Sequence, residues 1–214
     1  MTFSVGIWDL TTYAIPGSLY LSLLIYIGDR MDWVSAATIG KVPTAVLIAT
    51  AAIASYVLGH LSYPLAALLD RYPRDRIATA QAAVRQIFVD RVPGERSSRL
   101  VRTNIQLLRT AGEIHHPGAI AEAIRLNALG LMVRGCASAM LLAAPVAALE
   151  LALGTHKAAA VTLLIFFVVS ALAGIRRSRR LRDWAEMKTL EISYWMPEVD
   201  TALPPAESPA SPTS

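Results

Sequence analysis

The chain has 214 residues, a formal net charge of +4 and a hydrophobic fraction of 54%, with a mean hydropathy of +0.45. Soluble domains of this length usually have about 45–50% apolar residues, spread through short periodic segments. Here the apolar excess is concentrated in four blocks, which argues against a soluble domain, and the single Cys136 excludes disulfides within the chain.

The four apolar blocks predict four membrane-spanning helices. In chain order they are residues 13–27, 42–58, 135–153 and 158–175. A helix rises 1.5 Å per residue, so a hydrocarbon core of about 30 Å needs roughly 20 apolar residues. Only a helix satisfies its own backbone groups there. The first block is short unless residues 10–12 extend it, and the fourth is the clearest because it ends abruptly at Arg176. We predict an all-α integral membrane protein with two transmembrane hairpins.

The distribution of Lys and Arg predicts the orientation. Ten lie between Asp70 and Ala128 and six follow Ile175, whereas the two loops inside the hairpins hold three, and Arg134 lies at the boundary. Basic loops stay on the cytoplasmic side, and an even number of spans leaves both termini on one side. We therefore expect both termini and the central region to face the cytoplasm across a bacterial inner (plasma) membrane. We expect no cleavable signal peptide, because no basic segment precedes the first apolar block.

The region between the hairpins predicts a cytoplasmic helical hairpin. Apolar residues at helical spacing predict one helix over 75–90, with Asp75 as its N-cap. A second helix is predicted over 98–112, with Ser97 or Ser98 as its cap. The second helix is two-faced, with an apolar side that packs on the first helix and a basic side.

The expected organisation has five parts. These are an N-terminal transmembrane hairpin (1–62), a cytoplasmic helical region (63–127), a C-terminal transmembrane hairpin (128–176), a cytoplasmic juxtamembrane helix (177–200) and a disordered tail rich in Pro and Ser (201–214). From about residue 119 a helical pattern resumes and can continue without a break into the third span. Such a helix would couple the cytoplasmic region to the membrane.

Candidate ligand-binding residues lie on the basic side of the second cytoplasmic helix. Arg99, Arg102 and Arg109 form a stripe, and His115 and His116 follow at the next turn. Guanidinium groups bind phosphates and carboxylates, and basic helices bind acidic lipid headgroups. The stripe therefore fits an anionic small molecule such as a nucleotide, or acidic membrane lipid. The alternative is a solvated face kept positive only by the topology rule. We expect no direct binding to duplex DNA.

Two charged residues belong to the third span. Arg134 either lines a polar path, since intramembrane charges often mark function, or extends to the cytoplasmic interface along the base of its helix. Glu150 is either a pore or gating carboxylate or an interfacial residue, because it lies near the outer end of the span.

The sequence contains no pattern of a catalytic or metal site. The histidines have no carboxylate or Cys at metal-ligand spacing. Nucleophile elbows, phosphate-binding Gly loops and His-Glu-x-x-His helices are also missing. We therefore expect no metal, no other cofactor and no enzymatic activity.

Two segments carry a resemblance to a known group of proteins. The segment DLTTYAIPG at residues 9–17, the segment GHLS at residues 59–62 and the hairpin–insert–hairpin layout resemble small four-span membrane effectors of bacterial antiphage defence systems. The resemblance covers the two N-terminal spans in motif and the whole chain in layout. It implies an effector that a nucleotide-type signal switches and that then permeabilises or depolarises the inner membrane. No ligand-binding or catalytic residue carries over position by position.

Three functions remain open from the sequence. The first is an oligomeric membrane effector or ion channel controlled through the cytoplasmic helices, in which small residues such as those at 135–139 allow close helix contacts in a homo-oligomer. The second is a membrane anchor or scaffold that recruits a cytoplasmic protein partner through residues 75–112. The third is a lipid-active enzyme or small transporter, which needs a polar cavity at membrane depth.

Overall fold

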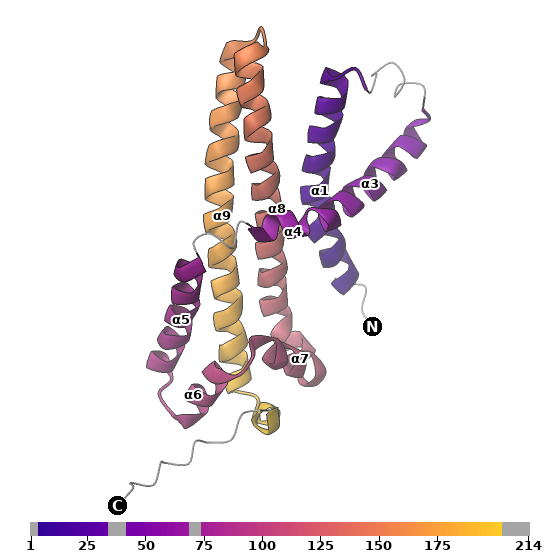
Figure 1. Cartoon of the computed structure of the whole chain (residues 1–214). Coiled ribbons are helices and arrows are strands. Elements are labelled where there is room, and N and C mark those ends of the chain that lie inside the picture. Colours follow the sequence, from indigo (N-terminus) through magenta and orange to yellow (C-terminus); the bar gives the residue numbers. More distant parts are fainter. Residues whose placement is uncertain (1–3, 34–41, 69–73, 203–214) are drawn as a thin grey trace, which may run out of the picture. The chain divides into compact units, whose positions relative to one another are not determined.

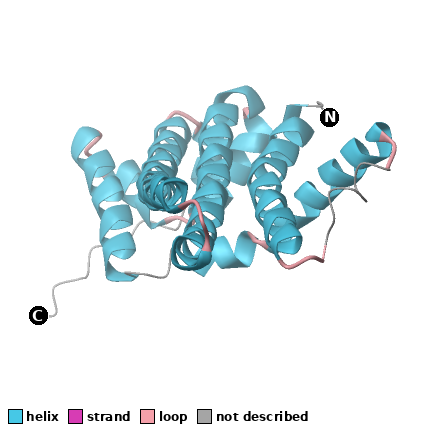
Figure 2. Ribbon diagram, turned by 90° about the horizontal axis from the view of Figure 1, so that it is seen from above, coloured by secondary structure: helices cyan, strands magenta, loops and turns pink. Residues whose placement is uncertain are grey.

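The computed structural model describes residues 4–33, 42–68 and 74–202. Its helices are α1 (Ser4–Arg30), α3 (Thr44–Leu61), α4 (Tyr63–Leu68), α5 (Arg74–Arg91), α6 (Glu95–Arg102), α7 (Ile105–His115), α8 (Pro117–Leu153), α9 (Lys157–Tyr194) and the 3-10 helix η1 (Pro197–Ala202) (Figure 1). No strand occurs in these ranges (Figure 2). The predicted all-α fold is confirmed. Most of the predicted disordered tail, 203–214, lies outside the described residues.

Four stretches of helix are long and apolar enough to cross a membrane. They are Leu10–Arg30, Thr44–Leu68, Pro117–Leu153 and Lys157–Tyr194. The four predicted spans are confirmed, and residues 10–12 do extend the first one. Large apolar side chains such as Ile53 on α3 and Val169 on α9 are exposed by 67% and 59%, which suits contact with lipid. The chain is a multi-pass membrane protein.

The chain divides into two compact units. The membrane unit comprises Met1–Tyr72 and Ala128–Arg180, and the polar module comprises Pro73–Asn127 and Leu181–Ser214. The boundary falls inside α8 and inside α9, so each of these helices contributes residues to both units.

Helices α8 and α9 continue where the sequence composition changes. The helix predicted from residue 119 into the third span is confirmed, because α8 runs from Pro117 to Leu153. Residues 177–194, which the sequence assigned to a separate juxtamembrane helix, continue α9. The physical reason is that no Gly or Pro occurs between Gly174 and Pro197. The change from apolar to charged residues does not interrupt a helix, since Arg, Lys, Glu and Leu are all good helix formers.

Helix α1 packs on α3 through two glycines. Gly17 lies against the backbone carbonyl of Ser55, and Gly59 lies against the backbone carbonyl of Tyr13. A Cβ atom on either glycine would overlap the backbone of the facing helix. Such close approach is the usual means of helix association in membranes, where van der Waals packing replaces the hydrophobic effect.

Helix α1 also packs on α8. A Cβ atom at Gly135 would lie 2.8 Å from Cβ of Pro16. One turn further along α1, the Tyr20 hydroxyl lies 2.7 Å from Ser138 Oγ. Because Ser138 donates its own hydrogen to the Gly135 carbonyl at 2.8 Å, Tyr20 is the donor. Gly135 and Ser138, two of the small residues at 135–139 that the sequence offered for contacts between copies, thus contact α1 of the same chain.

The polar module has its own apolar core. The buried core residues are Phe88, Leu100, Leu108, Leu190, Met196 and Val199. They come from α5, α6, α7, the C-terminal part of α9, the turn after it and η1. Residues near the C-terminus therefore complete a core that the sequence analysis assigned to the 75–112 segment alone.

The second predicted cytoplasmic helix is wrong as a single helix over 98–112. Helix α6 ends at Arg102, and α7 begins at Ile105. The Asn104 side chain caps α7 by accepting a hydrogen bond from the Gln106 N–H at 2.8 Å. The break changes the register of the apolar residues, and Leu107 on α7 is 57% exposed.

The predicted helix caps also differ from the structure. Asp75 lies inside α5, which begins at Arg74. Helix α6 begins at Glu95 after Gly94, so Ser97 and Ser98 lie in its first turn. Their hydroxyls donate to the Gly94 carbonyl at 2.8 and 3.2 Å. Serine hydroxyls can bond nearby carbonyls inside a helix as well as cap one.

The contact between α1 and α3 predicts that alanine substitutions at two glycines change the stability of the protein by very different amounts. Gly17→Ala should destabilise the protein by at least about 2 kcal/mol, because overpacking a tight contact costs about 1–3 kcal/mol. Gly118→Ala, on α8 with open space around it, should be neutral or stabilising by up to about 1 kcal/mol. Chemical denaturation of the detergent-purified protein, followed by tryptophan fluorescence, measures both. Equal effects would contradict the packing described here.

Candidate functional site

The predicted basic stripe lies in the polar module, but its arginines have different surroundings. Arg109 on α7 donates from Nε to the Thr189 hydroxyl on α9 at 3.3 Å. Burial lowers the pKa of the Arg109 guanidinium, and the Glu186 carboxylate opposes that shift, so the arginine stays protonated at neutral pH. Arg99 is partly exposed and Arg102 is exposed, and both lie in the last turn of α6.

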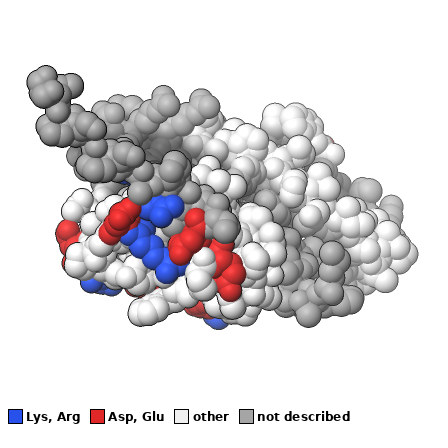
Figure 3. Space-filling view, turned by 90° about the horizontal axis from the view of Figure 1, so that it is seen from below, with Lys and Arg blue, Asp and Glu red and all other residues white. Residues whose placement is uncertain are grey.

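Carboxylates from the C-terminal part of the chain pair with basic residues of α5 to α8. The pairs are Arg85–Glu186 at 2.9 Å, Arg96–Asp200 at 3.1 Å, Arg91–Glu191 at 3.7 Å and His116–Glu198 at 3.7 Å. Positive and negative side chains are interspersed on the face that Figure 3 shows. An anion that approaches these arginines therefore competes with carboxylates of the same chain.

The Arg85–Glu186 pair is the best enclosed of these contacts. The side chains are 35% and 10% exposed, and Arg85 also donates to the Val101 carbonyl at 3.0 Å. Arg96 forms a second such link, because it donates to the Met196 carbonyl at 2.7 Å. These arginines join α5 and α6 to α9 and to the turn before η1. Sequence analysis missed the pairs because about 100 residues separate their members, and no local pattern reports such contacts.

The two histidines of the predicted site lie at the junction of α7 and α8. His115 is the last residue of α7 and is exposed. His116 follows it and pairs with Glu198, as given above. Among the described residues, no group of three or more His, Cys, Asp and Glu side chains is placed to hold a metal ion.

Arg134 is buried against an aromatic ring in the membrane unit. The residue is 5% exposed, and its guanidinium carbon lies 4.9 Å from the centre of the Tyr63 ring. Tyr63 in turn contacts Tyr13, whose ring centre lies 4.2 Å from that of His60. A desolvated cation over an aromatic ring gains about 2 kcal/mol. Neither sequence interpretation of Arg134 included this aromatic contact.

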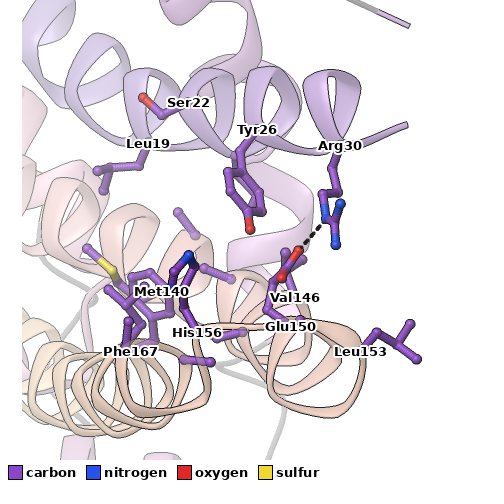
Figure 4. Close-up of a pocket in the computed structure, with 18 of the residues that line it drawn as sticks. Leu19, Ser22, Tyr26, Arg30, Met140, Val146, Glu150, Leu153, His156 and Phe167 are labelled. Carbon is purple, nitrogen blue, oxygen red and sulfur yellow. Dashed lines mark hydrogen bonds and ion pairs between the residues drawn. The ribbon is translucent and has the colours of Figure 1, made fainter. Parts of the chain in front are cut away.

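Glu150 lies at one end of a pocket in the membrane unit (Figure 4). Its Oε1 accepts a hydrogen bond from Arg30 Nε at 2.7 Å, which joins the last residue of α1 to the last turn of α8. The sequence analysis placed Arg30 in a loop and assigned Glu150 no partner. A hairpin-to-hairpin contact over 120 residues leaves no local pattern to find.

The pocket has an apolar body and a polar end. Its volume is about 670 Å³, and α1, α8, the connection after α8 and the start of α9 line it. Apolar side chains such as Leu19, Met140 and Phe167 form most of the wall. Tyr26 and His156 line it together with the Arg30–Glu150 pair (Figure 4). Pockets that bind small molecules usually have this composition and about 300–1,000 Å³ of volume.

Comparison of the chain with protein-family models, with curated proteins and with solved structures finds no match.

Removing the charge of Arg85 should cost more stability than removing the charge of a residue in an exposed ion pair. Arg85→Met should destabilise the polar module by about 2 kcal/mol, less than the 3–5 kcal/mol of a fully buried pair because Arg85 is partly exposed. Lys188→Met, which breaks the exposed Lys188–Glu191 contact of 2.9 Å, should cost at most about 1 kcal/mol. Denaturant titration of the full chain compares them. A larger loss for Lys188→Met would contradict this ranking.

Proposed function

We propose that the chain is an oligomeric effector or ion channel of the bacterial inner membrane, whose permeability changes when the polar module receives a cytoplasmic signal. One observation carries the proposal: α8 and α9 are continuous helices that each contribute residues to both units. No catalytic step is part of this function.

The continuous helices supply a mechanism for coupling. Each turn of a helix is hydrogen-bonded to the next, so a rotation or shift imposed on one end is carried along the backbone. In the polar module, α9 is held by Arg85 through Glu186 and by Arg109 through Thr189. A signal that changes these contacts acts on the same helix that crosses the membrane.

An anionic signal fits this mechanism by competition. A phosphate group is a stronger partner for a guanidinium than a single carboxylate oxygen, because it accepts bidentate hydrogen bonds with more charge. Binding at Arg96 or Arg99 would then draw α6 away from the carboxylates at 186–200. Under this proposal the basic residues bind a nucleotide-type anion by exchanging partners.

Several copies are needed to form a pore. Within one copy the polar side chains near the helix contacts bond one another, as in the Tyr20–Ser138 and Arg30–Glu150 pairs. Helices α3 and α9 keep most of their apolar side chains exposed. These faces are available to lipid and to neighbouring copies, and we place the conducting path between copies.

Native mass spectrometry and liposome flux test the assembly directly. The detergent-purified chain should form one discrete assembly of three or more copies, and liposomes that contain it should release ions when a nucleotide-type anion is present on the side of the polar module. A clean monomer, or flux that is independent of every anion tried, would overturn the proposal.

Coupling through α8 has a separate test. The double variant Ala128→Gly and Leu129→Gly should loosen α8 at the unit boundary by roughly 1 kcal/mol per residue. It should abolish the flux response while the assembly mass stays unchanged. The matched control, Ala121→Gly with Glu122→Gly, loosens the same helix in its exposed N-terminal part and should keep the response. Loss of response in both variants would refute coupling at the boundary.

One observation favours the scaffold as a second candidate. Leu107 and Ile114 on α7 are exposed by 57% and 70%, and their spacing of seven residues places them on one face of the helix. Under the scaffold function this face binds a cytoplasmic protein, and the chain conducts no ions. Leu107→Ser with Ile114→Ser should then abolish recovery of that partner, whereas Ile87→Ser, at an exposed position on α5, should not.

A further inference from the structure

The pocket of the membrane unit has the shape and polarity of an amphiphile. Its charged residues and His156 come from the ends of the elements that line it: Arg30 ends α1, Glu150 lies in the last turn of α8 and His156 precedes α9. Its apolar walls extend along the same three helices to Leu19, Met140 and Phe167. Ten or eleven residues therefore separate the polar end from the apolar end on every helix.

That separation matches one leaflet of a bilayer. At 1.5 Å per residue, ten helical residues span about 15 Å. The hydrocarbon core is about 30 Å thick, so one leaflet contributes about 15 Å. A molecule with an acyl chain as long as one leaflet and a polar head at the interface would fill the pocket from end to end.

The charges at the polar end of the pocket indicate which lipid headgroup would fit there. Arg30 uses Nε to bond Glu150, whereas a guanidinium has five N–H donors. Its side chain is 61% exposed, so the guanidinium is accessible to a phosphate. Glu150, with 26% of its side chain exposed, presents a carboxylate beside it. A cation and an anion in contact are complementary to a phosphate that is linked to an ammonium group.

We propose that this pocket binds a zwitterionic phospholipid with a primary amine headgroup. One acyl chain lies along the apolar walls, the phosphate bonds Arg30, and the ammonium group donates to Glu150. A choline headgroup offers no N–H donor to Glu150. A glycerol headgroup offers Glu150 no ammonium group beside Arg30, and its lipid adds a net negative charge near the carboxylate. The order of affinity is therefore ethanolamine, then choline, then glycerol.

This inference does not depend on the proposed channel function. The ligand is recognised within one copy, and all residues of the site belong to the membrane unit. Bound lipid would be measured as an adduct of defined mass, whereas the channel is measured by assembly mass and ion flux.

The test is native mass spectrometry of the full chain with three phospholipids of identical acyl chains and ethanolamine, choline or glycerol headgroups. The wild type should retain the ethanolamine lipid roughly tenfold better than the choline lipid, the ratio expected from one charge-assisted hydrogen bond. Glu150→Met, which keeps the length of the side chain and removes both acceptor oxygens, should reduce that ratio to about one. Arg30→Gln should weaken retention of all three lipids.

Matched variants separate the site from general lipid contact. Arg176→Gln removes an exposed arginine of α9 that does not line the pocket, and it should leave the headgroup order unchanged. Ala147→Phe should fill the pocket and reduce every adduct, whereas Ile165→Phe on the exposed surface of α9 should not.

Three results would overturn the inference. They are equal retention of the three lipids by the wild type, preference for the glycerol lipid, and a preference for ethanolamine that survives Glu150→Met. The first result would mean that the Arg30–Glu150 pair only closes the pocket. Because the comparison of the three lipids on the wild type needs no variant, it tests the proposal even where a substituted protein fails to fold.

Discussion

The close contact of α1 with α3 and α8 is the constraint on which the membrane unit depends. Without a hydrophobic driving force inside a bilayer, helices associate only where their backbones approach. Gly17 and Gly59 permit that approach on one side of α1, and Gly135 permits it beside Pro16 on the other. The Tyr20–Ser138 hydrogen bond then fixes α1 on α8. Because α1 is held in this way, Arg30 at its end meets Glu150 and the pocket has a third wall.

The polar module depends on a different interaction, the pairing of charges that are distant in sequence. Arg85 and Arg96 each bond a backbone carbonyl and a carboxylate. Their partners lie on the C-terminal part of α9 and beyond it, at Glu186 and Asp200. Basic residues that suggest an open anion site in the sequence are therefore paired with carboxylates of the same chain. An anion at Arg85 or Arg96 would have to exchange with these carboxylates.

The sequence was sufficient for the features that depend on local composition. Four apolar blocks of membrane length predicted four spans, and the resumed helical pattern after Pro117 predicted the continuous α8. It was insufficient where distant residues decide the outcome. The cap at Asn104 split a helix that periodicity alone had joined. The pairs Arg30–Glu150 and Arg85–Glu186 each join residues about 100 positions apart, and neither leaves a pattern in one sequence.

The length of α9 has a consequence of its own. Its 38 residues span about 57 Å, nearly twice the thickness of a hydrocarbon core. Every residue added to a helix rotates all later residues by about 100°. One residue inserted between Glu186 and Thr189 would thus turn Thr189 by about 100° relative to Glu186, so α9 could no longer meet Arg85 and Arg109 together, although no contact residue had changed. Substitutions at exposed positions of this part of α9, such as Lys188, are constrained weakly, whereas insertions and deletions are constrained by helical phase.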